Sequence, residues 1–468
     1  MKARCLAAGL VLGAAVALAA GCVPQKAGTA WVNPLETMEA ALPQDPQDNN
    51  YILRRMEFGH LAMTLGSNVR AKPRLQEAFE QLGAERDNTA AALTTEQLKY
   101  YKGETYERAM LGCYLGMLEY EAGQYNNARI FLSRALSADG AAVVNKNTPA
   151  SYGDDFGLAY FWIGKTFAKM NDADQCAIAL RKAAAKTDRK DAAKEVQQDQ
   201  KACEELLKRR QEGEQWVWRT FHDAANKNLF TDGITNLAEV KATCAAPPAN
   251  LPEASKDNPI VRVTDKPEEF FTPAYQADTN LTCMIEIGRC PFKYLTGIEG
   301  ERTEFMRCPV RLSALRVYVD GHYAGTAIEV LDLWHQAATQ DRIAEKDAAQ
   351  AAKGIAKYIL RNMPYVGNAA GYWNVSGDVR HWTSLPGRAY LFAAKLTPGP
   401  HTIRLEMYDT AGNLLPRLTN TYYGMPVPAA GEACYVLKPW VEGDNRVPEE
   451  TIKKALTAGT RPGYMWNY

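Results

Sequence analysis

A short stretch near residue 380 places a carboxylate, a guanidinium and an indole close together. Asp378, Arg380 and Trp382 follow one another at a spacing of two residues. Such a set could bind a polar ligand through its two charges, over the face of the indole ring. In the structural alternative, which we favour, Asp378 and Arg380 pair or satisfy backbone groups at the start of a strand, while Trp382 packs into a β-sandwich.

Other signals of catalysis or metal binding are weak. The chain has six histidines, and no two have the spacing of paired metal ligands on a helix, so no metal and no cofactor is expected. No Gly-x-Ser-x-Gly segment marks a nucleophilic serine. Cys113 falls on an expected helix, where a buried small thiol is commoner than a nucleophile. The sequence therefore does not indicate an enzyme.

The N-terminus indicates export and lipid attachment. Residues 1–21 have the charged start, apolar run and small-residue end of a signal peptide. The stretch Leu18-Ala19-Ala20-Gly21-Cys22 resembles the bacterial lipobox, in which the cysteine is acylated after cleavage. The alternative is ordinary secretory cleavage that leaves Cys22 unmodified. Because each buried acyl CH₂ contributes ~0.8 kcal/mol, several chains would hold the protein at a membrane. Val23 after the cysteine fits routing to the outer membrane.

Charge and composition narrow the class of protein further. Lys plus Arg equals Asp plus Glu at 54 each, so no net field favours nucleic acid, and none is expected as a partner. A hydrophobic content of 46% suits a globular protein with real cores. Residues 22–50 would comprise the lipidated Cys22 and a stretch rich in Pro, Gln, Asn and Ala, and this composition indicates a tether leading into a first helix.

The cysteines permit disulfides in an oxidising compartment. Of ten cysteines, Cys5 leaves with the signal peptide and Cys22 is acylated, so eight thiols stay available. The sequence cannot choose among their pairings. We expect disulfides mainly in the C-terminal half, where Cys283, Cys290 and Cys308 fall close together.

Internal repeats dominate the N-terminal half. The segments Ile52–Leu82, Ala109–Asp139 and Gly157–Lys186 fit one helix–turn–helix template with the small residues and turn spacing of the tetratricopeptide repeat. Pro73 fits poorly within the second helix of the first copy. A charged helical stretch at about 190–228 would close the array. We therefore predict a tetratricopeptide-like helical solenoid over residues 51–230.

Such arrays usually meet their partners through the first helix of each repeat. The positions expected to be exposed there combine apolar and charged side chains. In the alternative, the methionines and the tyrosine belong to the core between repeats and the lysines only solubilise. The predicted partner-binding groove consists of His60, Met63, Met117, Tyr120, Glu121, Lys165 and Lys169.

Strand patterns take over after a linker predicted at 231–267. Residues 315–319 alternate, Asp320-Gly321 is a hairpin turn, and further strands are expected at 401–407, 419–423 and 433–437. An Ala-rich helical insertion is expected at about 333–362. These features predict a β-rich, sandwich-like domain over 268–440. The tail 441–468 could bind a partner or dock on the domain as a strand.

Three stretches carry a family resemblance. The segments 103–108 (GETYER) and 378–386 (DVRHWTSLP), and more loosely 286–293 (EIGRCPFK), resemble an uncharacterised family of bacterial lipoproteins that contain tetratricopeptide repeats. The resemblance extends over most of the mature chain. It implies an α+β multidomain protein with a helical N-terminal half and a β-rich C-terminal half. It also implies an envelope role, with the cell-wall synthesis machinery as one class of partner.

Together these features predict a periplasm-facing lipoprotein of the outer membrane. It would serve as a non-enzymatic scaffold for envelope or periplasmic proteins through its helical repeats. The competing hypothesis is an envelope enzyme, or a glycan- or ligand-binding lipoprotein, with its site in the β-rich domain. A deep pocket with converging polar groups would favour that alternative.

Overall fold

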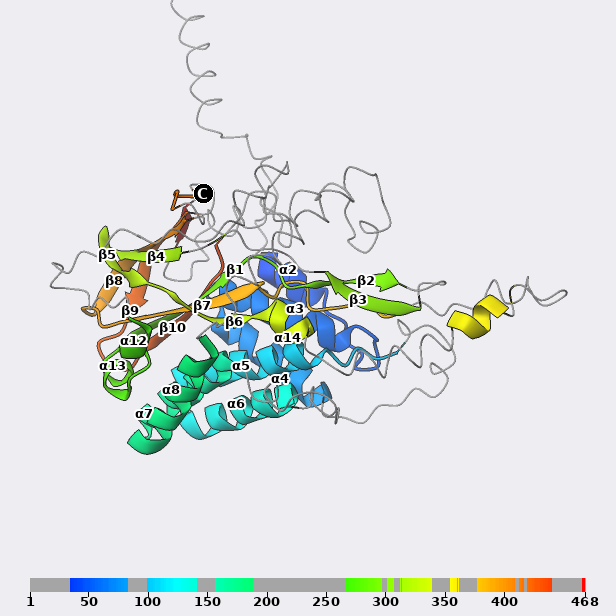
Figure 1. Ribbon diagram of the computed structural model, residues 1–468, viewed down its shortest axis with the longest axis horizontal. Helices are drawn as coiled ribbons and strands as arrows, with labels where there is room; N and C mark the ends of the chain where they lie inside the picture. The colour runs from blue at the N-terminus through cyan, green and yellow to red at the C-terminus, as the bar shows by residue number, and fades with distance from the viewer. Residues whose placement is uncertain are drawn as a thin grey trace, which may run out of the picture.

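The computed structural model has a helical part and a strand-rich part, so the fold is α+β (Figure 1). Cys22, the signal peptide and most of the predicted linker lie outside the residues that it describes. The described residues are 34–82, 99–140, 156–187, 266–296, 301–306, 312, 314–338, 354–359, 361, 377–408, 412–415, 419–439 and 465–467.

Helical hairpins occupy the three places where the sequence repeats. In each hairpin the first helix turns back onto the second through a tight loop. The pairs are α3 (Tyr51–Thr64) with α4 (Asn68–Leu82), α5 (Thr105–Glu121) with α6 (Tyr125–Gly140), and α7 (Gly157–Lys169) with α8 (Ala173–Thr187). Pro73 lies inside α4 without ending it.

The hairpins repeat the same close contact. A glycine on each first helix faces a leucine on the second. A Cβ added to Gly59 or Gly116 would lie 2.5 Å from the leucine Cγ, and one added to Gly164 would lie 2.8 Å from the leucine Cδ2. Only glycine permits this approach of the two helices. The facing leucines are Leu75, Leu132 and Leu180, and residues with positive φ form the turns at Gly66, Gly123 and Asn171.

A four-stranded sheet lies next to the helices. Its strand order is β10-β1-β7-β6, in which β1 runs antiparallel to β7 and parallel to β10. Strand β7 also pairs antiparallel with β6. The strands are β1 (Leu281–Ile287), β6 (Ile328–Asp332), β7 (Arg388–Ala394) and β10 (Ala433–Leu437).

A second sheet has five strands in the order β11-β9-β8-β4-β5. The predicted hairpin turn is confirmed, because Asp320 and Gly321 have φ values of 52° and 84° between β4 and β5. In the C-terminal tail, β11 pairs antiparallel with β9, as in the docked-strand alternative. The strands are β4 (Ala314–Val319), β5 (His322–Thr326), β8 (Gly399–Tyr408), β9 (Asn420–Val427) and β11 (Met465–Asn467).

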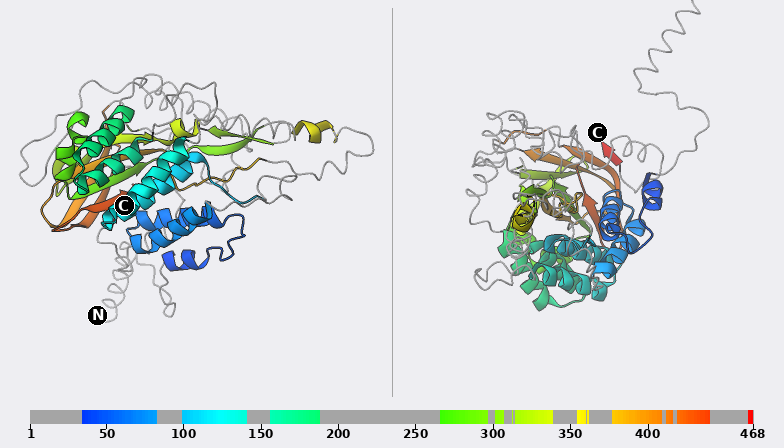
Figure 2. Two further views of the ribbon diagram at one scale, coloured as in Figure 1. Left: turned by 90° about the horizontal axis from the view of Figure 1, so that it is seen from below. Right: turned by 90° about the vertical axis from the view of Figure 1, so that its right-hand side faces the viewer.

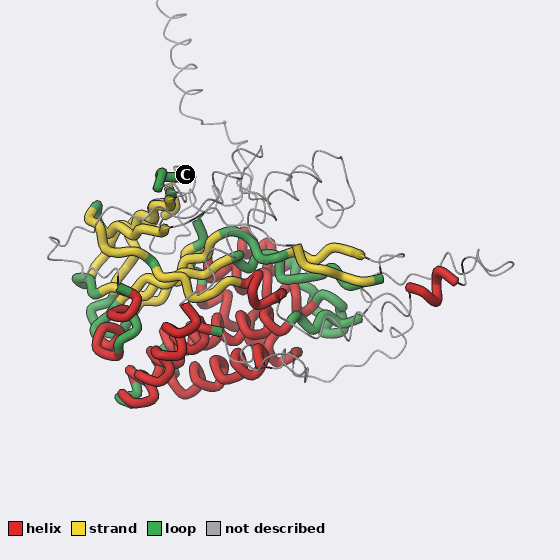
Figure 3. Tube along the Cα trace, in the orientation of Figure 1, coloured by secondary structure: helices red, strands yellow, loops and turns green. Residues whose placement is uncertain are grey.

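Strand β1 is buried along its whole length because both of its faces are covered. Leu281, Cys283 and Ile285 belong to an apolar core shared with the five-stranded sheet. Met284 belongs to the larger core shared with the helices. The helices form an arc around one side of the sheets (Figure 2, right), and the separation of helix from strand is clear in Figure 3. The face of the helices that the sequence analysis expected to bind a partner is therefore covered by the chain's own sheet.

Shorter elements complete the described fold. Helices α12 (Pro267–Phe270) and α13 (Pro273–Ala277) precede β1, and α14 (Leu333–Ala338) follows β6. Strands β2 (Phe292–Thr296) and β3 (Arg302–Met306) form a ribbon. Of the predicted helical insertion, α14 and the helical residues 354–359 are described.

The predicted tether is wrong for its second half. Helix α2 (Pro34–Ala40) and the loop after it pack against the body of the protein. Leu35 and Leu42 are buried there, and Glu36 and Glu39 pair with Arg70 of α4. Two leucines in a polar, proline-containing stretch were enough to dock it. Among the described helices, none is long and apolar enough to cross a membrane.

Candidate functional site

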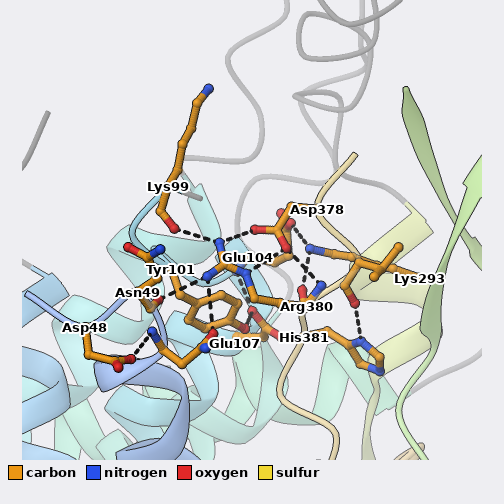
Figure 4. A network of polar contacts seen from close by, with 12 residues as sticks. Asp48, Asn49, Lys99, Tyr101, Glu104, Glu107, Lys293, Asp378, Arg380 and His381 are labelled. Atoms are coloured by element: carbon orange, nitrogen blue, oxygen red, sulfur yellow. Dashed lines mark hydrogen bonds and ion pairs between the residues drawn. The ribbon is translucent and has the colours of Figure 1, made fainter. Parts of the chain in front are cut away.

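The three stretches that carry the family resemblance meet at one place between the helices and the four-stranded sheet. Residues 103–108 form the start of α5, residues 286–293 run from the end of β1 into β2, and residues 378–386 form the loop before β7. Figure 4 shows side chains from all three parts of the chain in one polar network. We treat this junction as the candidate site.

The first part of the site is built on the N-terminus of α5. Glu104 and Glu107 form a capping box: the side chain of each accepts a hydrogen bond from the backbone N–H of the other. The Glu107 carboxylate also accepts hydrogen bonds from the Tyr101 hydroxyl at 2.6 Å and the Trp382 backbone N–H at 2.5 Å. Lys293 forms an ion pair with Glu104 and donates to the Arg380 carbonyl at 3.1 Å. The helix start thus holds the two other segments together.

Burial shifts the protonation of this network. It raises the pKa of the Glu107 carboxyl, although Lys293 acts in the opposite direction. For Lys293 burial alone would lower the pKa, but Glu104, Glu107 and Asp378 raise it. Burial lowers the pKa of His381 to about 4. At neutral pH His381 is therefore an uncharged side chain whose Nδ1 lies 3.0 Å from the Val379 carbonyl oxygen.

Asp378 and Arg380 form a bidentate pair, as in the structural interpretation. Arg380 Nε lies 2.9 Å from Oδ1 of Asp378, and Arg380 Nη2 lies 2.8 Å from Oδ2. The remaining guanidinium N–H groups donate to the carbonyl oxygens of Asn49, at 3.0 Å, and Lys99, at 2.8 Å, and to Asn50 Oδ1, at 3.2 Å. The pair closes a loop instead of starting a strand. Both charges are therefore committed to contacts within the chain.

Trp382 is fully buried, but not between the two sheets as expected. It belongs to the core that joins the helices to the four-stranded sheet. Its ring lies edge-on to His60 at 5.8 Å and to Tyr114 at 5.7 Å between centroids. The indole Nε1–H donates to Ser384 Oγ at 2.8 Å. Trp382 thus connects the Glu107 network to a second set of polar side chains.

That second set surrounds the carboxylate of Glu286, at the end of β1. Oε2 of Glu286 lies 2.8 Å from His60 Nε2 and 3.2 Å from Lys438 Nζ. Oε1 accepts a hydrogen bond from the Tyr114 hydroxyl at 2.5 Å. His60 Nδ1 lies 2.9 Å from Ser384 Oγ. Burial alone would raise the pKa of Glu286, but His60, Lys438 and the hydrogen bonds lower it to about 2.

A third set of buried charges lies further along the interface, at Glu432 before β10. Lys165 Nζ is 2.6 Å from Oε1 of Glu432, and Lys169 Nζ is 3.4 Å from Oε2. The Tyr120 hydroxyl donates to Oε2 at 2.7 Å and the Thr282 hydroxyl to Oε1 at 2.5 Å. These contacts tie α5 and α7 to the four-stranded sheet.

The exposure predicted for the partner-binding groove is wrong. His60, Lys165 and Tyr120 are only 1–3% exposed and bond to carboxylates of the C-terminal half. Met63 and Met117 are core residues. The Glu121 carboxylate accepts from the Asn68 side chain and the Cys434 backbone N–H, and Lys169 is partly covered. The alternative that placed the methionines and the tyrosine in a core agrees better with the structure, although the four-stranded sheet as well as the neighbouring repeats contributes to that core.

The expected disulfides are absent at the cysteines that can be assessed. Cys283 and Cys290 carry free, buried thiols, as do Cys113, Cys176 and Cys434, while Cys308 lies outside the described residues. Cys283 points into the core between the sheets, whereas Cys290 belongs to the core beneath the helices. The two side chains therefore lie on opposite sides of the sheet and cannot meet.

Comparison of the chain with models of protein families, with curated proteins and with solved structures gave no match. The chemistry of the junction is thus the basis for any functional inference. It contains a carboxylate, an imidazole and a hydroxyl joined in one row of hydrogen bonds. It also contains ion pairs between side chains of the helical half and side chains of the strand-rich half. Glu286 and Ser384 were missed by the sequence reasoning because their partner His60 is more than 200 residues away, and Lys438 was missed because its partner Glu286 is more than 150 residues away.

Proposed function

We propose that the protein is a lipoprotein of the outer membrane that faces the periplasm and acts as a scaffold for envelope proteins. Cys22 after the apolar run would carry the lipid anchor. The hairpins would be tetratricopeptide-type repeats, and the two sheets would form a sandwich-like domain. The repeated glycine–leucine contact and the core shared by the sheets support these assignments. Envelope or periplasmic proteins, including the cell-wall synthesis machinery, are the expected partners.

The observation that carries the scaffold proposal is an apolar residue on the outer surface of each hairpin. Fourteen residues after the close-contact glycine, the second helix presents Pro73, Ile130 and Ile178. All three are exposed, Ile130 by 57% and Ile178 by 41%. A repeated apolar residue at one position of consecutive hairpins forms a ridge for another protein. This ridge replaces the inner groove, which the chain's own sheet fills.

The test is crosslinking in intact envelopes with the double variant Ile130→Glu/Ile178→Glu. Two charges on the ridge should abolish partner capture without unfolding the protein, because both side chains are exposed. The matched control is Ser133→Glu/Gln175→Glu, which adds the same charges at exposed positions of α6 and α8.

A Cys22→Ser variant should move to the soluble fraction, since it lacks the acylated thiol.

Partner capture that is the same in the ridge variant, the control and the wild type would contradict the scaffold proposal. Circular dichroism and melting must be unchanged in both double variants. The readout is the identity and amount of each crosslinked protein, quantified by mass spectrometry.

A further inference from the structure

Ser384, His60 and Glu286 form a continuous hydrogen-bonded chain across the helix–sheet junction. Ser384 Oγ lies 2.9 Å from His60 Nδ1, and His60 Nε2 lies 2.8 Å from Glu286 Oε2. The three residues come from the loop before β7, from α3 and from β1. A hydroxyl, an imidazole and a carboxylate in this order and at these distances are the parts of a serine nucleophile with its base.

The partners of Glu286 determine which ring nitrogen carries the proton. An ionised carboxylate can only accept, so His60 Nε2 donates its proton to Glu286. In the neutral imidazole Nδ1 is then an acceptor, and the Ser384 hydroxyl donates to it. Trp382 Nε1–H donates to the same Oγ at 2.8 Å. Oγ thus keeps one lone pair that can attack a carbonyl carbon, and the indole N–H can stabilise negative charge that develops on Oγ.

We propose that Ser384 is the nucleophile of an esterase site, with His60 as its general base and Glu286 as the residue that positions the imidazole. This activity goes beyond the scaffold role and does not depend on it. His60 Nδ1 would take the hydroxyl proton as Oγ bonds to the carbonyl carbon of an ester. The ester C–O bond breaks, and the leaving alkoxide takes that proton from the imidazolium. Water attacks the acyl-enzyme by the same route, which releases a carboxylic acid and restores Ser384.

The surroundings of Ser384 select a short acyl group. Trp382 and Leu385 are fully buried beside it, and the equally buried Tyr114 packs against Trp382, so little space is left for a long chain. Ser384 itself is half-buried, and its neighbour Thr383 is exposed and donates to Glu57 at 3.0 Å. An ester would reach Oγ from the Thr383 side. We therefore assign acetyl and similarly short carboxylic esters as the substrate class.

The decisive experiment is labelling of the full lipidated protein, in detergent, with a fluorophosphonate probe. Ser384 Oγ should displace fluoride from phosphorus, and mass spectrometry should locate the adduct on Ser384. Ser384→Ala should lose the label, whereas Thr383→Ala, which removes a neighbouring exposed hydroxyl, should keep it. p-Nitrophenyl acetate hydrolysis should fall at least 100-fold in Ser384→Ala relative to the wild type. Because the wild type alone is informative, misfolding of a variant does not obscure the result.

Failure to label wild-type Ser384, or hydrolysis that is unchanged in a folded Ser384→Ala variant, would overturn the proposal. The role of Glu286 has its own readout in the pH profile of labelling. Glu286→Gln removes the negative charge that favours the imidazolium, so the midpoint of the profile should move to lower pH and the maximum rate should fall. His60 also packs against Tyr114, and Lys438 lies 3.2 Å from Glu286; both side chains are unchanged in this variant. A profile that keeps its midpoint would contradict the positioning role.

Discussion

Two buried carboxylates at the helix–sheet junction have partners from the helical half of the chain. Lys165 of α7 pairs with Glu432 before β10, and His60 of α3 and Lys438 pair with Glu286 of β1. Removing one member of such a buried pair costs about 3–5 kcal/mol, because the other charge loses its compensation. These side chains therefore hold the helices on the sheet only while both partners are present.

Acidification should destabilise the protein through His381. Its pKa falls from 6.5 in the unfolded chain to about 4 in the folded protein. The unfolded state thus binds a proton first, so the stability from the neutral imidazole is present above pH 6.5 and is lost as the pH falls toward 4. Between pH 7 and pH 5 the free energy of unfolding should drop by roughly 2 kcal/mol from this group.

Urea denaturation of wild type and His381→Gln at both pH values measures this effect. Glutamine keeps a donor for the Val379 carbonyl but does not titrate, so the variant should lose less stability on acidification. The two proteins share every other titrating group. Glu107, with its raised pKa, gains stability on acidification, and Glu286 loses its stabilising charge only as the pH falls from about 4.5 to about 2. Equal losses in the two proteins would contradict the assigned shift.

Helices, strands and turns could be predicted from the sequence where their contacts join residues that are close together in the chain. The hairpins are at the predicted places because the glycine and the leucine that touch are only sixteen residues apart, as at Gly116 and Leu132. The turn at Asp320-Gly321 is equally local. Pairing of β1 with β10 joins residues more than 150 positions apart, and no local pattern encodes it. The partners of His60 and Tyr120 are also far away in the sequence, so neither these contacts nor the burial of the predicted groove could be predicted.

The glycine–leucine contact gives a prediction about the hairpins. Gly116→Ala places a methyl against Leu132 and should cost about 1–3 kcal/mol of stability by overpacking. Leu132→Ala alone should cost about 2–5 kcal/mol, because it leaves a cavity. In the double variant the new methyl occupies part of that cavity, so the combined cost should be smaller than the sum.

A double-mutant cycle by urea denaturation measures this coupling. Gly123→Ala is the control, since its φ of 72° strains alanine but no atom lies within 4 Å of the added methyl. Its cost should add to that of Leu132→Ala. Strict additivity in the Gly116 cycle would show that the two helices do not cross as closely as described.

On the scale of the whole molecule, the two halves form one body. The helices curve around the four-stranded sheet, and the buried pairs of Glu104, Glu286 and Glu432 lie along the junction. Because the inner face of the hairpins is filled, the proposed partners would bind on the outside. The central claim is thus that this junction stays closed in the native protein.

Two cysteines on neighbouring strands test the closed junction. Cys434 of β10 lies under the helices, whereas Cys283 of β1 lies between the two sheets, and both are at most 1% exposed. Pulse labelling of the native protein with N-ethylmaleimide, read by peptide mass spectrometry, compares them in one sample. A closed junction predicts that both thiols stay unmodified in the native protein and become reactive together in a single unfolding transition. Rapid modification of Cys434 in the native protein while Cys283 stays protected would show that the helices leave the sheet, and would contradict the account.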